Sequence, residues 1–171
     1  KGGTLHLNES QFAENYRFIG PQGNHSQRDY MFSSSALMWS SDETKEWYPV
    51  FCSHWAFGAD NQTVYYKLRE EVKWSDGTPC TADDYVWAWQ MWNDPLLDAP
   101  FYNKYGAKFE VKKINDYCLA IKWLESDKLT KYELIDNTNF VAYNKKFFNN
   151  GQLYKNWHVD FNWKYSPTTR P

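Results

Sequence analysis

The stretch YKLREEVKWSDGTPCTADD, residues 66–84, carries the signals that decide the fold. It contains Asp76-Gly77, a pair that favours a tight turn because glycine adopts positive φ without steric cost. Thr81 follows, with Asp84 three residues later, and this spacing is that of a capping box with Asp in place of Glu. The stretch therefore predicts the end of a strand, a tight turn and the start of a helix in close succession.

The predicted helix runs from Thr81 to about Asn93 and ends before Pro95, because the residue preceding a proline avoids helical geometry. Its apolar side chains recur at helical spacing and form two stripes with only a narrow polar strip left. One stripe consists of Tyr85, Ala88, Trp89 and Trp92, and the other of Trp87 and Met91. We therefore expect other parts of the protein to cover this helix on most of its sides.

Alternation of apolar and polar residues predicts a β-hairpin immediately before the 66–84 stretch. Its strands are residues 55–57 and 63–69, separated by a cluster of turn-forming residues. Val64, Tyr66 and Leu68 share one face of the second strand. The pattern is that of a half-buried strand.

Further along the chain, residues 108–123 alternate about a second turn and predict another hairpin. Residues 28–38 are compatible with a short helix that ends at residues 40–42, and residues 128–135 look helical. The pattern of residues 140–148 is ambiguous between helix and strand. Together these elements predict an α+β fold, with a mixed or antiparallel sheet and a few helices packed on it.

Composition excludes several classes of protein. Aromatic residues make up 20% of the 171 residues, and no run of about 18 apolar residues suggests a membrane-spanning helix. Lys residues interleaved with aromatic residues could suggest single-stranded nucleic acid. However, the formal net charge is −2, whereas a chain that binds phosphates should be clearly basic. We therefore expect no nucleic-acid partner.

Cysteine and histidine give no sign of a metal site or of catalysis. Cys52, Cys80 and Cys118 lie among apolar or small residues without metal-ligand spacing. Buried free thiols are the favoured interpretation, and one disulfide with one free thiol is the alternative. The four histidines are scattered, so we predict no metal and no cofactor. No nucleophile elbow, phosphate-binding loop or dinucleotide fingerprint occurs, so we expect no catalytic residues.

Residues 66–84 resemble the signature of the family 5 extracellular solute-binding proteins, the oligopeptide- and dipeptide-binding subunits of bacterial ABC importers. Further matches follow in the family's order. Residues 1–5 look like the mature start of these proteins, residues 47–55 are similar to the segment before the first hairpin, and residues 113–117 are similar to the turn of the second hairpin. The resemblance covers most of residues 1–130 and is weaker after that.

The resemblance implies a fragment of a type II periplasmic-binding-protein-like fold. Residues 1–44 would be the N-terminal part of lobe I, and residues 45–160 a small inserted α+β domain. Residues 161–171 would begin the return to lobe I. Because family members are several times longer, with two lobes that close over a ligand, we expect the second lobe to be absent from this chain.

The family's function is the capture of a peptide or similar solute for import, so the resemblance implies ABC permease subunits in the membrane as partners. It also implies a periplasmic or extracellular location, with the full-length protein either free or lipid-anchored. No enzyme activity is expected.

Two segments match family positions that line the ligand cleft. The first is the loop of Phe18, Ile19, Gly20 and Pro21, where Ile19 stands roughly in the place of an acidic residue. The second is Phe101, which matches a tyrosine near the pocket and keeps the apolar wall without the hydroxyl group. Ordinary loop packing is the alternative role for both segments.

The abundance of aromatic residues leaves a second functional class open, a carbohydrate-binding module or glycoside hydrolase domain. Exposed Trp and Tyr side chains stack on sugars, and a pair of carboxylates acts as acid and base in glycosidases. However, most of the aromatic residues occupy the inward positions of the predicted strands and helix, as core residues do. No carboxylate stands out from its neighbours. The solute-binding hypothesis is therefore the leading one.

Overall fold

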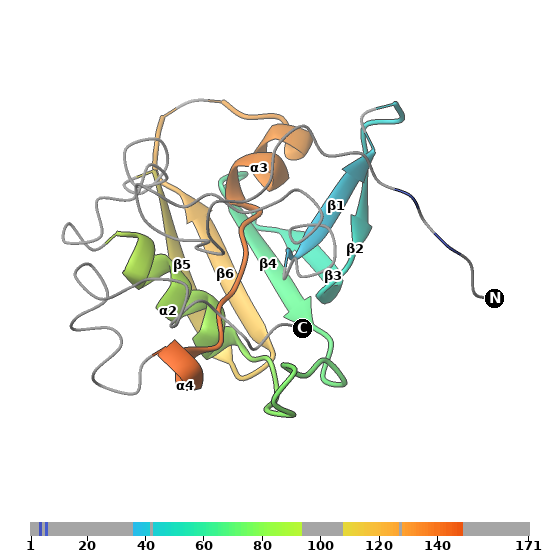
Figure 1. Cartoon of the computed structure of the whole chain (residues 1–171). Coiled ribbons are helices and arrows are strands. Elements are labelled where there is room, and N and C mark those ends of the chain that lie inside the picture. Colours follow the sequence, from blue (N-terminus) through green and yellow to red (C-terminus); the bar gives the residue numbers. More distant parts are fainter. Residues whose placement is uncertain are drawn as a thin grey trace.

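In a computed structural model of the chain, the described residues are Thr4, His6, 36–41, 43–93, 108–126 and 128–148. They form a two-stranded and a four-stranded antiparallel sheet with helices packed on one face of the larger sheet (Figure 1). The strands are β1 (Met38–Ser41), β2 (Glu46–Pro49), β3 (Cys52–Phe57), β4 (Thr63–Leu68), β5 (Phe109–Asn115) and β6 (Cys118–Trp123). The helices are α2 (Ala82–Trp92), α3 (Lys131–Thr138) and α4 (Lys145–Phe148).

The larger sheet has the strand order β3-β4-β6-β5, and both predicted hairpins are present in it. Tyr66 lies opposite Leu119 and Val64 lies opposite Ile121, so the buried faces of β4 and β6 coincide. Tyr65 and Lys67 alternate with these residues and are exposed. The sheet thus has one face in the core and one face toward solvent, as antiparallel sheets allow.

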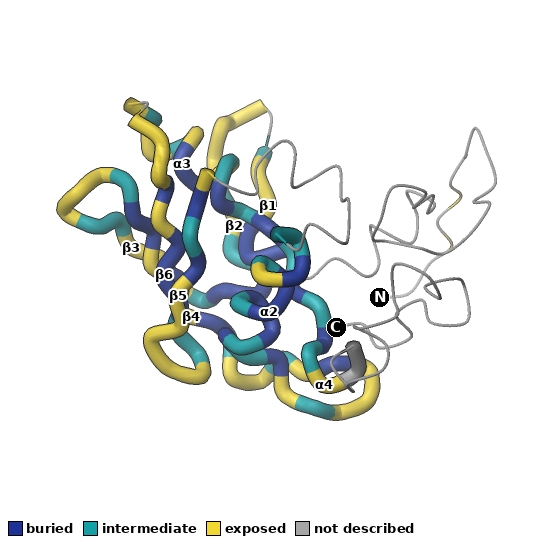
Figure 2. The backbone as a smooth tube through the Cα atoms, turned by 90° about the vertical axis from the view of Figure 1, so that its left-hand side faces the viewer, coloured by how far each residue is buried: buried dark blue, intermediate teal, exposed yellow. Residues whose placement is uncertain are grey.

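Helix α2 covers the inner face of this sheet at β5, and α3 covers β4 and β6 (Figure 1). Tyr85, Trp87, Ala88 and Met91 of α2 are buried, so the prediction of a helix covered on most sides is confirmed. The buried backbone is concentrated where α2 faces the strands, whereas the connecting turns at the sheet ends are exposed (Figure 2). The α+β class and the antiparallel sheet predicted from the sequence are confirmed.

The hairpin of β1 and β2 is the main difference from the predicted elements. Met38, predicted to end a helix, begins β1, and Ser40 and Ser41 lie within that strand rather than after a helix. Met38 is fully buried and Trp39 is 47% exposed. The strand pairs with β2 along its whole length, from Met38 opposite Pro49 to Ser41 opposite Glu46. An apolar run this short does not distinguish helix from strand, which is why the sequence pattern misled. Residues 28–35 of the predicted helix lie outside the described residues.

Helix α3 begins three residues later than predicted, after the capping box of Thr130 and Glu133. The ambiguous segment that follows it is extended and leads into the single turn of α4. In it Phe140, Ala142 and Asn144 are buried and alternate with half-buried residues. This segment crosses in front of the sheet between α3 and α4 (Figure 1).

The three cysteines are free thiols, and Cys52 and Cys80 are buried. Burial raises the pKa of the Cys52 thiol to about 11 and also raises that of Cys80, so both are unreactive at neutral pH. The favoured interpretation of buried free thiols is therefore confirmed for these two residues. Within the described ranges no helix has the length and apolar character needed to span a bilayer. Nor do His, Cys, Asp and Glu gather there into a group able to hold a metal ion.

Candidate functional site

The 66–84 stretch builds a tight turn whose polar atoms are held by its own side chains. Gly77 has a φ of +83°, the left-handed conformation that its position in the sequence predicted. The Asp76 carboxylate accepts hydrogen bonds from the Thr78 backbone N–H (2.9 Å) and from the Thr78 hydroxyl (2.6 Å). These hydrogen bonds lower the pKa of Asp76, which is therefore ionised at neutral pH.

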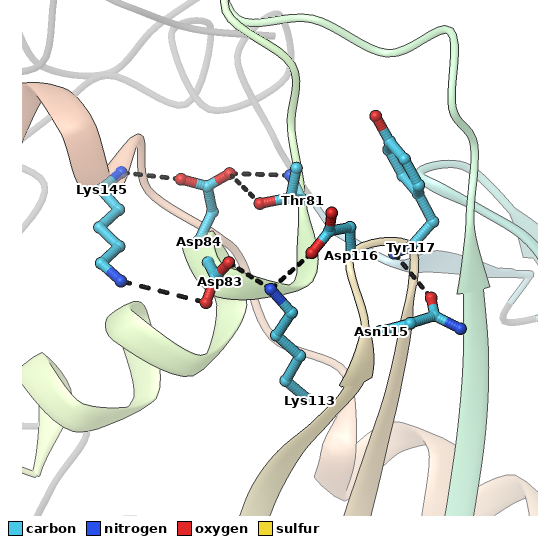
Figure 3. A network of polar contacts seen from close by, with 8 residues as sticks. All are labelled: Thr81, Asp83, Asp84, Lys113, Asn115, Asp116, Tyr117 and Lys145. Carbon is cyan, nitrogen blue, oxygen red and sulfur yellow. Dashed lines mark hydrogen bonds and ion pairs between the residues drawn. The ribbon is translucent and has the colours of Figure 1, made fainter.

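The start of α2 is organised around Asp84, which is only 5% exposed. Its carboxylate accepts the backbone N–H of Thr81 at 2.8 Å, so it reaches back to the residue that precedes the helix as predicted. The same carboxylate accepts the indole N–H of Trp74 at 3.3 Å and the backbone N–H of Lys145 at 2.8 Å (Figure 3 shows Thr81 and Lys145). Asp84 thus connects the turn, the helix and a segment 61 residues further along the chain.

Burial raises the pKa of Asp84, because the charged form loses its hydration. The hydrogen bonds from Thr81, Lys145 and Trp74 act in the opposite direction and lower it, whereas the neighbouring charge of Asp83 raises it further. The net direction is upward. Asp84 is therefore easier to protonate in the folded protein than in the unfolded chain.

A second group of charges lies beside Asp84 on the surface (Figure 3). The ammonium group of Lys113 on β5 is 2.6 Å from a carboxylate oxygen of Asp83 and 2.6 Å from one of Asp116. These two hydrogen bonds raise the pKa of Lys113. The group joins α2 to the turn between β5 and β6, and its exposure to solvent makes each ion pair weak.

The extended segment after α3 is attached to the turn and to α2 by polar contacts. The side-chain amide of Asn144, which is 1% exposed, donates to a carboxylate oxygen of Asp76 at 3.1 Å and to the hydroxyl of Thr78 at 3.3 Å. The backbone N–H of Lys145 donates to Asp84. The residues that define the signature therefore accept hydrogen bonds from a distant segment, in addition to forming a turn and a helix cap.

The beginning of the same segment is attached to β1. The Asn139 side chain accepts the Met38 backbone N–H at 3.1 Å and donates to the Met38 carbonyl oxygen at 2.9 Å. An isolated antiparallel bridge between Ala36 and Val141 continues this contact. Neither Asn139 nor Asn144 was singled out from the sequence. Residues 140–143 are all apolar, so the sequence shows no alternation there that could have pointed to them.

The contacts of this network join the signature turn, α2 and residues 139–145 to one another. Asp84 accepts three N–H donors from three separate parts of the chain and thereby holds them together. The residues predicted from the resemblance to contact a ligand are Phe18, Ile19, Gly20, Pro21 and Phe101, and all of them lie outside the described residues. Their role stays a prediction.

A family profile described as "Bacterial extracellular solute-binding proteins, family 5 Middle" matches residues 46–165. The chain belongs to this family. The match includes the β3–β4 and β5–β6 hairpins, the signature turn, α2 and the segment with Asn139 and Asn144. The family 5 resemblance noted in the 66–84 stretch is thereby confirmed, and so is the assignment of the fold.

Family 5 relatives of known name match parts of the chain. The periplasmic murein peptide-binding protein MppA of Escherichia coli is 39% identical over 62 residues, which is 36% of this chain and 11% of that protein. The periplasmic oligopeptide-binding protein OppA of Haemophilus influenzae is 35% identical over 77 residues, 45% of this chain and 14% of that protein. The matched regions thus span only a small part of these relatives.

Solved structures show the same fold as the family 5 chain. The oligopeptide-binding protein AppA of Bacillus subtilis, in complex with a nonapeptide, aligns with a TM-score of 0.66 and 18% identity. It covers 91% of this chain, and the chain covers 30% of it. OppA of Haemophilus influenzae, in complex with RPPGFSPFR, aligns with a TM-score of 0.64 and 22% identity over 88% of this chain and 32% of that one. At these identities the likeness concerns the fold alone.

Proposed function

We propose that this chain is part of a solute-binding component of an ABC importer and that the full-length protein captures a peptide or a similar solute. The observation that carries the proposal is the family match over residues 46–165, which contains the intact signature turn and helix cap. Supporting it, relatives named for binding oligopeptides, a dipeptide and a murein peptide share 35–51% of residues with parts of the chain. The permease subunits of the importer are the proposed membrane partners.

The proposed protein is longer than 171 residues and has two lobes. In this proposal residues 1–44 belong to lobe I, residues 45–160 to the inserted domain, and residues 161–171 to the return into lobe I. The chain covers 30% and 32% of the two solved structures, which supports a protein longer than this chain. Affinity would come from a largely pre-formed cleft between lobes whose closure the bound solute favours.

Within that cleft, the proposed contributions of this chain are the loop of Phe18 to Pro21 and the ring of Phe101. The proposed activity is binding without bond chemistry. The relatives are binding proteins, and this supports the proposal. A periplasmic or extracellular location follows from the same relatives, with the choice between a free and a lipid-anchored form left to experiment.

A sugar-directed function has little support. Among the described aromatic residues, Tyr66, Trp74, Tyr85 and Phe109 are buried in the core. The exposed rings of Trp39 and Tyr48 form a cross-strand pair on the β1–β2 hairpin. The matching relatives give no support to a carbohydrate-binding role.

The proposal is tested by the cargo of the full-length protein. The protein is purified under gentle conditions, denatured, and the released small molecules are identified by mass spectrometry. We expect peptides in near-stoichiometric amount. Recovery of glycans in their place would contradict the proposal, and an empty protein that binds no member of a peptide library would do so equally.

A further inference from the structure

The segment of residues 139–145, called the strap from here on, is fixed at its first residue to β1. Asn139 pairs through both atoms of its side-chain amide with both main-chain groups of Met38, a residue 101 positions earlier. Both hydrogen bonds are of ordinary length, 3.1 and 2.9 Å, and both are partly buried. The amide of Asn139 therefore completes the backbone pairing of Met38 as a neighbouring strand would.

The other end of the strap is fixed to the signature. Asn144 donates to Asp76 and Thr78, and the backbone N–H of Lys145 donates to the buried carboxylate of Asp84. Opening this end leaves the buried side chains of Asn144 and Asp84 with fewer hydrogen-bond partners. The free-energy cost of this is larger than that of losing exposed hydrogen bonds.

Between its two ends, the strap is short. Residues 139 to 145 could span at most ~20 Å even in a fully extended chain, so an end cannot move far without pulling on the rest. Phe140 is buried and its ring contacts those of Tyr85 (5.8 Å between centroids) and Phe109 (5.6 Å). Displacement of either end therefore also disturbs the core contact between α2 and β5.

We propose that the strap is a single cooperative element that couples β1 to the signature turn and the start of α2. Asn139 and Asn144 are its two fixing residues, and the polar residues of the signature are its docking site. Asp76, Thr78 and Asp84 thereby act at long range. Through the strap they transmit a displacement of the signature turn to β1, and a displacement of β1 to the turn. The inference does not depend on which solute the protein binds.

The test is amide hydrogen exchange of the 171-residue chain, followed at single residues by NMR. In Asn144→Ala the informative amide is that of Met38, at the far end of the strap, and in Asn139→Ala it is that of Lys145. We expect each far-end amide to exchange about tenfold faster or more, since opening one end opens the whole strap. The amide of Ile121, in the centre of the larger sheet, should keep its protection.

Asn137→Ala is the matched control, because the Asn137 side chain donates only to the Glu133 carbonyl oxygen within α3. It should leave both far-end amides unchanged. If Asn144→Ala does not fold, Thr78→Val removes the hydroxyl acceptor of Asn144, keeps the Asp76 acceptor, and should give a smaller change of the same two-ended kind. Acceleration confined to the end that carries the substitution would overturn the proposal, and so would a far-end effect of equal size in Asn137→Ala.

Discussion

At the scale of single residues, the signature depends on one backbone conformation and one buried carboxylate. Gly77 supplies the positive φ of the turn, and no atom lies within 4 Å of the position a Cβ would take there. The requirement for glycine is therefore conformational and not steric. Asp84, in contrast, is required for its contacts, because it accepts hydrogen bonds from Thr81, Trp74 and Lys145.

Gly77→Ala should destabilise the chain by about 1–2 kcal/mol, the cost of placing a Cβ residue in the left-handed region. Gly77→Asn is the matched variant, and it should cost less because Asn adopts this region more readily. Urea denaturation of the three proteins measures the difference. Equal stability of the wild type and Gly77→Ala would show that the turn does not need the positive φ.

The contribution of Asp84 to the free energy of unfolding should increase as the pH falls, whereas that of most carboxylates decreases. Its pKa is raised in the folded state, so the folded protein binds the proton more tightly than the unfolded chain. The contribution of this group therefore grows as the pH falls from neutral through the raised pKa toward the ordinary value of 3.8. We expect the stability advantage of wild type over Asp84→Asn to be larger at about pH 4.5 than at about pH 7.

The contrasting variant is Asp76→Asn, measured over a pH range that extends below 3.8, because the pKa of Asp76 lies under that value. The pKa of Asp76 is lowered by its hydrogen bonds to Thr78, so its contribution is present above 3.8 and is lost as the pH falls through the lowered value. Its advantage over the Asn variant should therefore shrink in acid. If the stability advantage of wild type over Asp84→Asn also shrinks in acid, burial does not govern the protonation of Asp84.

At the scale of elements, the parts predicted from sequence are those with a local pattern. The two hairpins follow from alternation at Val64, Tyr66 and Leu68 and around residues 108–123, and α2 follows from its cap and its apolar stripes. The β1–β2 hairpin was missed because its strands have four residues each, too few for alternation to be distinctive. The strap was ambiguous because its conformation is set by contacts 61 to 101 residues away.

Phe140 is the strap residue on which the packing of α2 against the sheet should depend most. Phe140→Ala should cost about 3–5 kcal/mol, because its buried ring leaves a cavity between Tyr85 and Phe109. Val141→Ala, at the adjacent half-buried position, should cost about 1 kcal/mol. Thermal and urea unfolding of the two variants provide the comparison. Similar costs for both would contradict the assignment of Phe140 to the core.

At the scale of the whole molecule, the sequence indicated the family but could not provide the ligand site. The signature residues form a turn, a helix cap and the docking site of the strap, so the contacts described for them are with other parts of the chain. The predicted ligand residues, Phe18 to Pro21 and Phe101, lie outside that part. The ligand site of a two-lobed protein also draws on residues from both lobes, and the proposed second lobe lies beyond this chain.

The measurement that tests this account most directly is a tryptophan-fluorescence titration with peptides, carried out in parallel on the 171-residue chain and on the full-length protein. We predict saturable binding by the full-length protein and weak or no binding by the 171-residue chain, since the cleft needs both lobes. Circular dichroism of the chain, showing mixed α and β structure, controls for its folding. Tight peptide binding by the chain alone would contradict the two-lobe account, and absence of peptide binding by the full-length protein would contradict the proposed function.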